Sequence, residues 1–233
     1  MEINILKKLF DSTVSERAVG FVDIVGWKDA FKTIGHEGLL KVAINIAKHK
    51  KQFSPEKKAE MAAWDKSHSM DVLGKYYEIN FSFISDCFVV SAPTENLEGL
   101  LNVIKWDCMC LIADHGFLTR GGISMGPFTH DTENDIALGL PLNEVVDLEK
   151  DTNMPRIQLS NNIVRIANHI SHPGLVYNDG EYEVLNIANK SKDWLYLAMG
   201  KIDKVLASSL DEHRKLKWHY LREHLPKMSE QVV

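Results

Sequence analysis

The 233-residue sequence has few of the features that mark membrane or nucleic-acid-binding proteins. No apolar run approaches the 18 or so residues that span a bilayer, so we expect no membrane association. Lys and Arg number 27 against 32 Asp and Glu, which gives a net charge of −5. Proteins that hold DNA or RNA neutralise many phosphates with dense positive charge, so we expect no nucleic-acid partner.

Cysteine is scarce, with only Cys87, Cys108 and Cys110. An odd number in a chain of this size argues against a disulfide framework and favours a reducing compartment. Residues 1–17 mix charged and apolar side chains and lack the uninterrupted apolar core of a signal peptide. The sequence therefore predicts a cytoplasmic protein.

What is present is an ordinary globular composition, with 45% hydrophobic and 25% charged residues. We expect a single domain over residues 1–233, with a core at about 18–160 and a C-terminal extension at about 161–233. A polar, Lys-rich stretch at 48–70 indicates an exposed insertion.

The hydrophobic periodicity of the core predicts alternating strands and helices. Strands are expected at 18–24, 76–83, 87–92 and 118–126, and helices from Trp27 onward, at 100–115 and at 141–148. This order is the ferredoxin-like β-α-β-β-α-β pattern of an α+β fold. After this pattern we expect a strand at 156–159, a helix at 161–169, strands near Leu175 and Tyr182, and one charged amphipathic helix over 201–224.

Two aspartates stand in otherwise apolar strand sequence. Asp23 lies in the run FVDIVGW at 21–27, and Asp86 lies in the expected hairpin turn at 84–86. A carboxylate beside large apolar neighbours is costly unless a cation compensates its charge, and hard oxygen ligands suit Mg²⁺ or Mn²⁺. In this topology the first strand is central and neighbours the hairpin strand, so the two carboxylates can converge. The alternatives are a salt-bridge partner for Asp23 and a simple turn role for Asp86.

Four segments in order resemble the catalytic domain of class III nucleotidyl cyclases, over residues 19–159. The run at 21–27 is similar to the family's first metal motif, F-x-D-I-x-G-F, and the turn at 84–86 stands where the family has I-G-D. The run RGGISMG at 120–126 is similar to R-x-G-I-x-x-G, and GLPLN at 139–143 corresponds to G-x-x-V-N. Each motif alone is weak, but the ordered set is fairly specific.

The resemblance implies a two-metal site that forms a cyclic nucleotide from a nucleoside triphosphate. It assigns Asp23, Asp86 and the Ile24 carbonyl to two Mg²⁺ or Mn²⁺ ions per site, and Asn143 to the ribose. A polar residue at the start of a helix is an equally good interpretation of Asn143. Triphosphate is expected against the backbone around Val25, Gly26 and Trp27. Family members place the site at a dimer interface, so a homodimer is expected.

The sequence also departs from the family at positions that read the base and at positions that carry positive charge for the triphosphate or the transition state. Ser82 stands where purine cyclases carry a base-selecting Lys, Ile136 falls near the adenine-reading Asp, and Asp147 stands where a transition-state Arg is expected. The usual C-terminal lysine motif that binds triphosphate is not recognisable. These departures argue against a purine substrate.

The pattern is closer to the pyrimidine cyclases of the Pycsar anti-phage system. Shared with that branch are the R-G-G-I-S-x-G strand and a series G-x-P-L, L-E and P-R-I, found here at 139–142, 148–149 and 155–157. The resemblance implies cyclic UMP or cyclic CMP as a signal for a separate effector, with UTP slightly favoured over CTP.

Three side chains are further candidates for this site. Arg156 is a candidate for the missing cationic group, because its planar fork suits phosphate; the alternative is a structural ion pair with Glu149. Arg120 is a candidate for substrate binding or for pairing with acids across a dimer. Ser82 is a candidate for reading the base.

Other function classes remain open. A diguanylate-cyclase-like or polymerase-palm protein shares the topology and the paired acids, but it predicts a G-G-D-E-F-type hairpin that 84–87 does not have. Adenylate or guanylate cyclase activity is a further alternative. A catalytically inactive, nucleotide-sensing cyclase-like domain is favoured by Asp147 in place of an arginine.

Overall fold

The computed structural model of the chain describes residues 14–54, 56–60, 63, 78–151, 153–169, 174–188, 191–208 and 210–232. The strands are β1 (Ser15–Val25), β2 (Asn80–Ile84), β3 (Cys87–Pro93), β4 (Leu118–Asp131), β5 (Ile136–Gly139), β6 (Ile157–Leu159), β7 (Val176–Asn178) and β8 (Glu183–Leu185). The α-helices are α2 (Trp27–Thr33), α3 (Gly35–Lys50), α5 (Leu97–Cys110), α6 (Leu140–Asp151), α7 (Asn161–Ala167), α8 (Lys192–Leu206) and α9 (Glu212–Glu230). Short turns of other helix types are η1 (Lys51–Phe53), η2 (Thr94–Asn96) and η3 (Leu111–His115).

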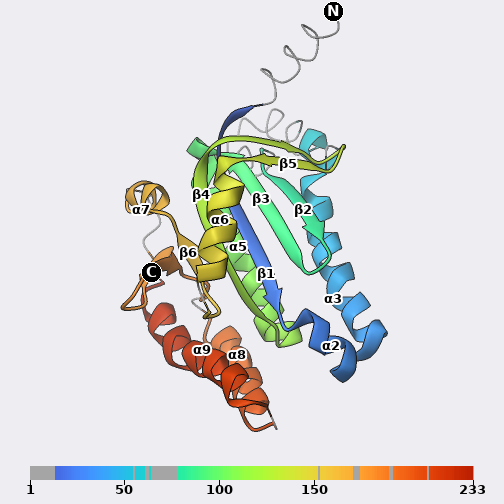
Figure 1. Ribbon diagram of the computed structural model, residues 1–233, viewed down its shortest axis with the longest axis vertical. Coiled ribbons are helices and arrows are strands. Elements are labelled where there is room, and N and C mark those ends of the chain that lie inside the picture. The colour runs from blue at the N-terminus through green and yellow to red at the C-terminus, as the bar shows by residue number, and fades with distance from the viewer. Residues whose placement is uncertain are drawn as a thin grey trace, which may run out of the picture.

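The fold is α+β, built on one mixed sheet in the order β2-β3-β1-β4-β6-β8-β7, with β5 paired to β4 (Figure 1). The expected β-α-β-β-α-β order of the core is confirmed by β1, α2 and α3, β2, β3, α5 and β4. β1 lies between β3 and β4 and is antiparallel to both, whereas β6 joins β4 in parallel. The first strand is therefore central, and the hairpin strand is its neighbour.

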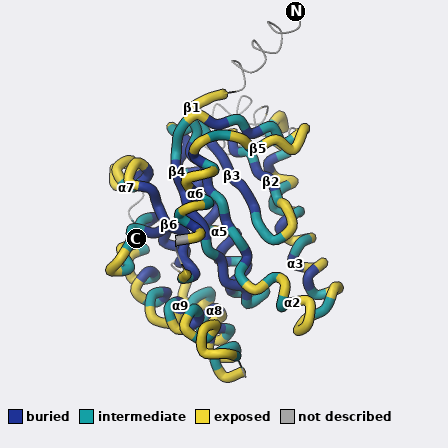
Figure 2. Tube along the Cα trace, viewed as in Figure 1, coloured by how far each residue is buried: buried dark blue, intermediate teal, exposed yellow. Residues whose placement is uncertain are grey.

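The two faces of β1 differ in what covers them. Val22 and Ile24 are buried in the main core, which also holds the buried side chains of α3 and α5. Phe21, Asp23 and Val25 alternate with them on the other face, where they are only half-buried. Figure 2 shows buried strands at the centre of the sheet and exposed outer surfaces on α6 and α9.

Two glycines of β4 let its neighbours come close. A Cβ on Gly121 would lie 2.0 Å from the Phe21 carbonyl oxygen of β1, and one on Gly122 would lie 3.0 Å from the Leu148 Cβ of α6. α6 therefore packs directly on β4, on the face of the sheet opposite α5. Arg120, immediately before these glycines, is held between β1 and α6.

The C-terminal prediction of one helix over 201–224 is wrong. The chain instead forms α8 and α9, with a break between Leu206 and Glu212. Asp211 starts the second helix by accepting a hydrogen bond from the Arg214 amide at 3.0 Å, as an N-cap does. No described helix is long and apolar enough to cross a membrane.

The Lys-rich stretch at 48–70 differs in part from the expected exposed insertion. α3 continues to Lys50, and Phe53 is buried and stacked on Phe81 with ring centroids 6.0 Å apart. Residues 55, 61–62 and 64–70 of this prediction, and the first two residues of the strand expected at 76–83, lie outside the described residues.

Candidate active site

The two aspartates lie on neighbouring segments at one end of the sheet. Asp23 is opposite Cys87 in the β1–β3 ladder, and the Ile24 amide donates a hydrogen bond of 2.8 Å to the Asp86 carbonyl oxygen. The hairpin turn that carries Asp86 is tight, with Ser85 at a φ of 59°. The structure thus places the backbones of Asp23, Ile24 and Asp86 side by side, as the strand order predicted. The convergence of the two carboxylates stays a prediction.

The charges of both aspartates reach the same sulfur atom. Burial, followed by the nearby carboxylates of Asp86 and Asp23, raises the pKa of the Cys87 thiol to about 11. In an antiparallel ladder the carbonyl of a residue projects to the same side as its amide, so we expect the Ile24 carbonyl on the side of Asp86. Two carboxylates and a peptide oxygen are the hard donors that Mg²⁺ or Mn²⁺ prefers, so this donor set fits the expected metal. No group of three or more metal-ligating side chains occurs within the described part of the chain.

Asp23 already has a cationic partner. Arg120 Nε donates a hydrogen bond of 2.9 Å to Asp23 Oδ2, and the same nitrogen lies 2.6 Å from Glu149 Oε1. Since one N–H points well at only one acceptor, Glu149 is an ion-pair partner whose Oε1 accepts no hydrogen bond from a described residue. The side chains of Asp23, Arg120 and Glu149 are 20%, 31% and 9% exposed. The alternative interpretation of Asp23 as a salt-bridge partner is thus also supported, because Asp23 pairs with Arg120 of the same chain.

Glu149 is an acid that lies beside the ion pair of Asp23 and Arg120. Its burial and the Asp23 charge raise its carboxyl pKa, against the lowering effect of Arg120. The pairing of Glu149 with Arg156 predicted from the sequence is wrong, because Glu149 lies beside Arg120, and Arg156 pairs with Asp179. Glu149 is separated from Asp23 only by the Arg120 side chain. This position depends on how α6 packs on β4, which the local sequence does not determine.

The backbone after Asp23 turns sharply at Gly26. Gly26 has a φ of 86° and a ψ of 9°, a left-handed conformation that favours glycine, and α2 begins at Trp27. A Cβ at Gly26 would meet no atom within 4 Å, so open space lies beside this backbone. Trp27 packs its ring against Phe117 at a centroid distance of 5.8 Å, so its backbone is the part available to a ligand.

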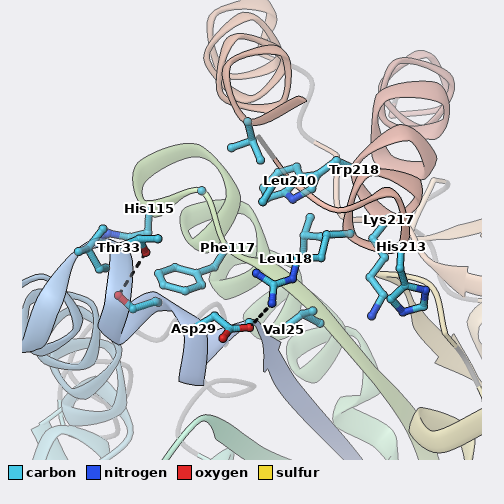
Figure 3. Close-up of a pocket in the computed structure, with 16 residues that line it drawn as sticks. Val25, Asp29, Thr33, His115, Phe117, Leu118, Leu210, His213, Lys217 and Trp218 are labelled. Atoms are coloured by element: carbon cyan, nitrogen blue, oxygen red, sulfur yellow. Dashed lines mark hydrogen bonds and ion pairs between the residues drawn. The ribbon is translucent and has the colours of Figure 1, made fainter. Parts of the chain in front are cut away.

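That open space continues into a cavity of about 400 Å³ (Figure 3). The end of β1 and α2 form one wall, the η3–β4 junction a second, and the ends of α8 and α9 a third. α9 contributes His213, Arg214 and Lys217. These three residues were not predicted from the sequence, because α9 lies near β1 only as a result of the interruption between α8 and α9.

Ser82 is buried rather than open to a ligand. Its hydroxyl lies 2.9 Å from His130 Nε2, and Ser91 Oγ lies 2.9 Å from His130 Nδ1. Burial, and then the positive charges of Arg17 and Lys58, lower the pKa of His130 to about 4. The hydroxyl predicted to read the base therefore already has a partner, which it would have to exchange for the base.

Arg156 belongs to a different cluster, which we call the Arg156 clasp: Arg156, Asp179, Glu181, Tyr182 and Tyr220. Its Nη1 donates to Asp179 Oδ2 at 2.8 Å and to Glu181 Oε2 at 3.2 Å. The guanidinium lies 4.0 Å from the centre of the Tyr182 ring, and the Tyr220 hydroxyl donates to Asp179 at 2.6 Å. Both Arg156 and Asp179 are buried side chains, so the geometry favours a structural role.

Asn143, the residue predicted to position the ribose, is exposed on the first turn of α6. It is free to approach a ligand bound over the half-buried face of the sheet. Its predicted role stays a prediction, as do those of Ser82 and Arg156.

Comparisons with known proteins give structural similarity alone. No family model and no curated protein matches the sequence. A bacterial light-regulated adenylyl cyclase is similar with 14% identity and a TM-score of 0.48, over 82% of this chain and 98% of that one. The adenylyl cyclase CyaB from P. aeruginosa is similar with 16% identity and a TM-score of 0.44, over 74% and 92%. The guanylyl cyclase domain of RhoGC from the fungus Blastocladiella emersonii is similar with 14% identity and a TM-score of 0.46, over 72% and 93%. At these identities and TM-scores the similarity does not establish an activity or a substrate.

Proposed function

We propose that this protein is a nucleotidyl cyclase. The observation that carries the proposal is the position of Asp23 and Asp86 on adjacent backbone segments beside the open backbone of Gly26. In the reaction the ribose 3′-oxygen forms a bond to the α-phosphorus, and the bond from that phosphorus to the oxygen bridging the α- and β-phosphates breaks. The 3′-hydroxyl proton passes to solvent, and pyrophosphate leaves.

The carboxylates of Asp23 and Asp86, with the Ile24 carbonyl, would hold two Mg²⁺ or Mn²⁺ ions. Such ions neutralise triphosphate charge and favour ionisation of the attacking hydroxyl. The backbone of Val25, Gly26 and Trp27 would lie along the phosphates. Asn143 would orient the ribose, while Arg120 balances the charge of Asp23.

For the substrate we favour a pyrimidine nucleoside triphosphate, UTP before CTP. This rests on Ser82, Ile136 and Asp147, which replace the residues typical of purine cyclases. The product would then be cyclic UMP or cyclic CMP, made in the cytoplasm as an anti-phage signal. Adenylate or guanylate cyclase activity is the alternative that the same site allows.

We further propose a homodimer with the sites at its interface. The face of the sheet that carries Asp23 and Phe21 is half-buried in the single chain, and Ile84 at its edge is 55% exposed. Leu138 and Leu140, on β5 and α6, are also exposed. A second copy over this face would bury these apolar side chains.

The test is incubation of the purified protein with each of the four ribonucleoside triphosphates and Mn²⁺. Pyrophosphate release and a cyclic product by mass spectrometry are expected, most with UTP. Asp23→Asn and Asp86→Asn should each abolish turnover and keep the wild-type circular dichroism spectrum. Asp203→Asn is the matched control, because Asp203 pairs with Arg222 on the surface of α8. Full turnover in both site variants would reject the proposal.

A catalytically inactive nucleotide sensor is the second candidate, and Asp147 in place of an arginine favours it. Asp147 is exposed on α6 and lies 3.4 Å from Lys150, so it offers a phosphate no positive charge. A sensor would bind one of the four nucleotides and release no pyrophosphate from any of them.

A further inference from the structure

Lys217 differs from the other lysines and arginines of α9 in having no acidic partner among the described residues. Arg214 contacts Asp29 and lies 3.0 Å from Asp211, and Lys215 lies 2.9 Å from Glu212. Around Lys217, by contrast, no carboxylate of the described residues comes within ion-pairing distance. Yet its side chain is half-buried at the wall of the 400 Å³ cavity. An ammonium group that is partly removed from water and left unpaired is one that an anion would stabilise.

The position of Lys217 links the cavity to the aspartates. It lines the cavity with Gly26 and with Val25, which lies two residues after Asp23. Figure 3 shows Lys217 and Val25 at this cavity. Burial and the Arg120 charge lower its pKa, and the Asp23 carboxylate raises it, so its ammonium is within electrostatic reach of both. Lys217 therefore lies where the cavity meets the metal-binding end of β1.

We propose that Lys217, from the same chain as Asp23, binds the β- and γ-phosphates of the substrate and then the leaving pyrophosphate. This rests on the proposed cyclase function for the identity of the ligand, but the anion site itself does not require turnover. The α-phosphate would lie at Asp23 and Asp86, and the phosphate chain would run past Gly26, where the backbone leaves open space.

The charge balance of the reaction supports a cation at this point. The terminal phosphates are the most negative part of the substrate, and expulsion of pyrophosphate adds charge to them. A lysine acts on phosphate as a compact point charge that needs no fixed fork geometry. Arg214 is less suited to this role, because Asp29 and Asp211 already offset its charge.

The test uses inorganic tripolyphosphate as the probe, titrated calorimetrically into the full chain with and without Mn²⁺. Lys217→Ala should weaken binding by about tenfold or more, which corresponds to about 1.4 kcal/mol or more. Lys217→Arg should retain most of the affinity. Lys215→Ala, which removes the same charge one half-turn away and outside the cavity, should bind as the wild type does. In turnover assays, the inhibition constant of pyrophosphate should rise in Lys217→Ala by the same factor.

Two outcomes separate this proposal from the proposed function. If no nucleotide is cyclised but tripolyphosphate binds in a Lys217-dependent manner, the anion site stands and the cyclase function fails. If the wild type cyclises a nucleotide and folded Lys217→Ala binds tripolyphosphate with unchanged affinity, the role of Lys217 is overturned.

Discussion

Replacing Arg120 by methionine should make the stability of the protein depend on divalent metal. The change keeps the aliphatic stem but leaves Asp23 and the nearly buried Glu149 without their shared cation. Breaking a fully buried ion pair costs roughly 3–5 kcal/mol. Because Arg120 is 31% and Asp23 20% exposed, water screens part of this loss, and we expect about 2 kcal/mol. For a chain of this length that lowers the melting temperature by about 4–8 °C.

Divalent metal should reverse this loss if Asp23 is a ligand. Mn²⁺ at a hundred times its dissociation constant adds about 2.7 kcal/mol to the folded state, enough to offset the missing guanidinium. Lowering the pH from 7 toward 5 should also help, since the pKa of Glu149 is raised by burial. An acid with a raised folded-state pKa destabilises the fold when ionised, and protonation removes that penalty.

Thermal unfolding in EDTA and in Mn²⁺, followed by circular dichroism, measures these effects. The double variant Arg120→Met with Asp23→Asn is the control, and it should gain little from Mn²⁺. The prediction is contradicted if Arg120→Met and the wild type have the same melting temperature in EDTA. It is equally refuted if Mn²⁺ stabilises the double variant as much as the single one.

Two further predictions concern buried polar groups. Arg156→Met should lower the free energy of unfolding, measured in urea, by about 3 kcal/mol, because the Asp179 side chain is 1% exposed and loses its charged partner. Unchanged stability together with lost turnover would instead support the catalytic role predicted from the sequence. Because the pKa of His130 is lowered to about 4, the unfolded chain takes up its proton first as the pH falls. The free energy of unfolding should therefore decline between about pH 6.5 and pH 4 by up to about 3 kcal/mol. His130→Gln should show a shallower decline. Urea titrations of both proteins across this pH range test the prediction, and equal declines would contradict it.

The sequence predicted the central strands because their signals are local. β1, β3 and β4 are apolar, β-branched runs interrupted by glycine or by a hairpin turn, and their expected bounds agree with the structure to within a few residues at most ends. The neighbouring positions of Asp23 and Asp86 followed from the topology. These features depend on residues close together in the chain or on a common strand order.

The electrostatic partners could not be predicted in the same way. Arg120 pairs with Glu149 because α6 packs on β4 at Gly122, and Arg156 finds Asp179 rather than Glu149 because the β7–β8 turn folds back over it. Lys217 comes close to β1 only because the helix is interrupted between α8 and α9, so that α9 turns back toward the sheet. Such pairings join segments far apart in sequence, and their register is set by packing.

The Arg156 clasp has a consequence for how far the protein can be shortened. The two carboxylates described around this guanidinium, Asp179 and Glu181, and the tyrosines beside it come from beyond residue 178, whereas Arg156 itself lies just before β6. A fragment cut near residue 160 would lose these two carboxylates and both tyrosines from around the Arg156 guanidinium. We therefore expect the minimal autonomous unit to include α9, so that the helix bearing Lys217 is integral to the fold rather than a dispensable appendage.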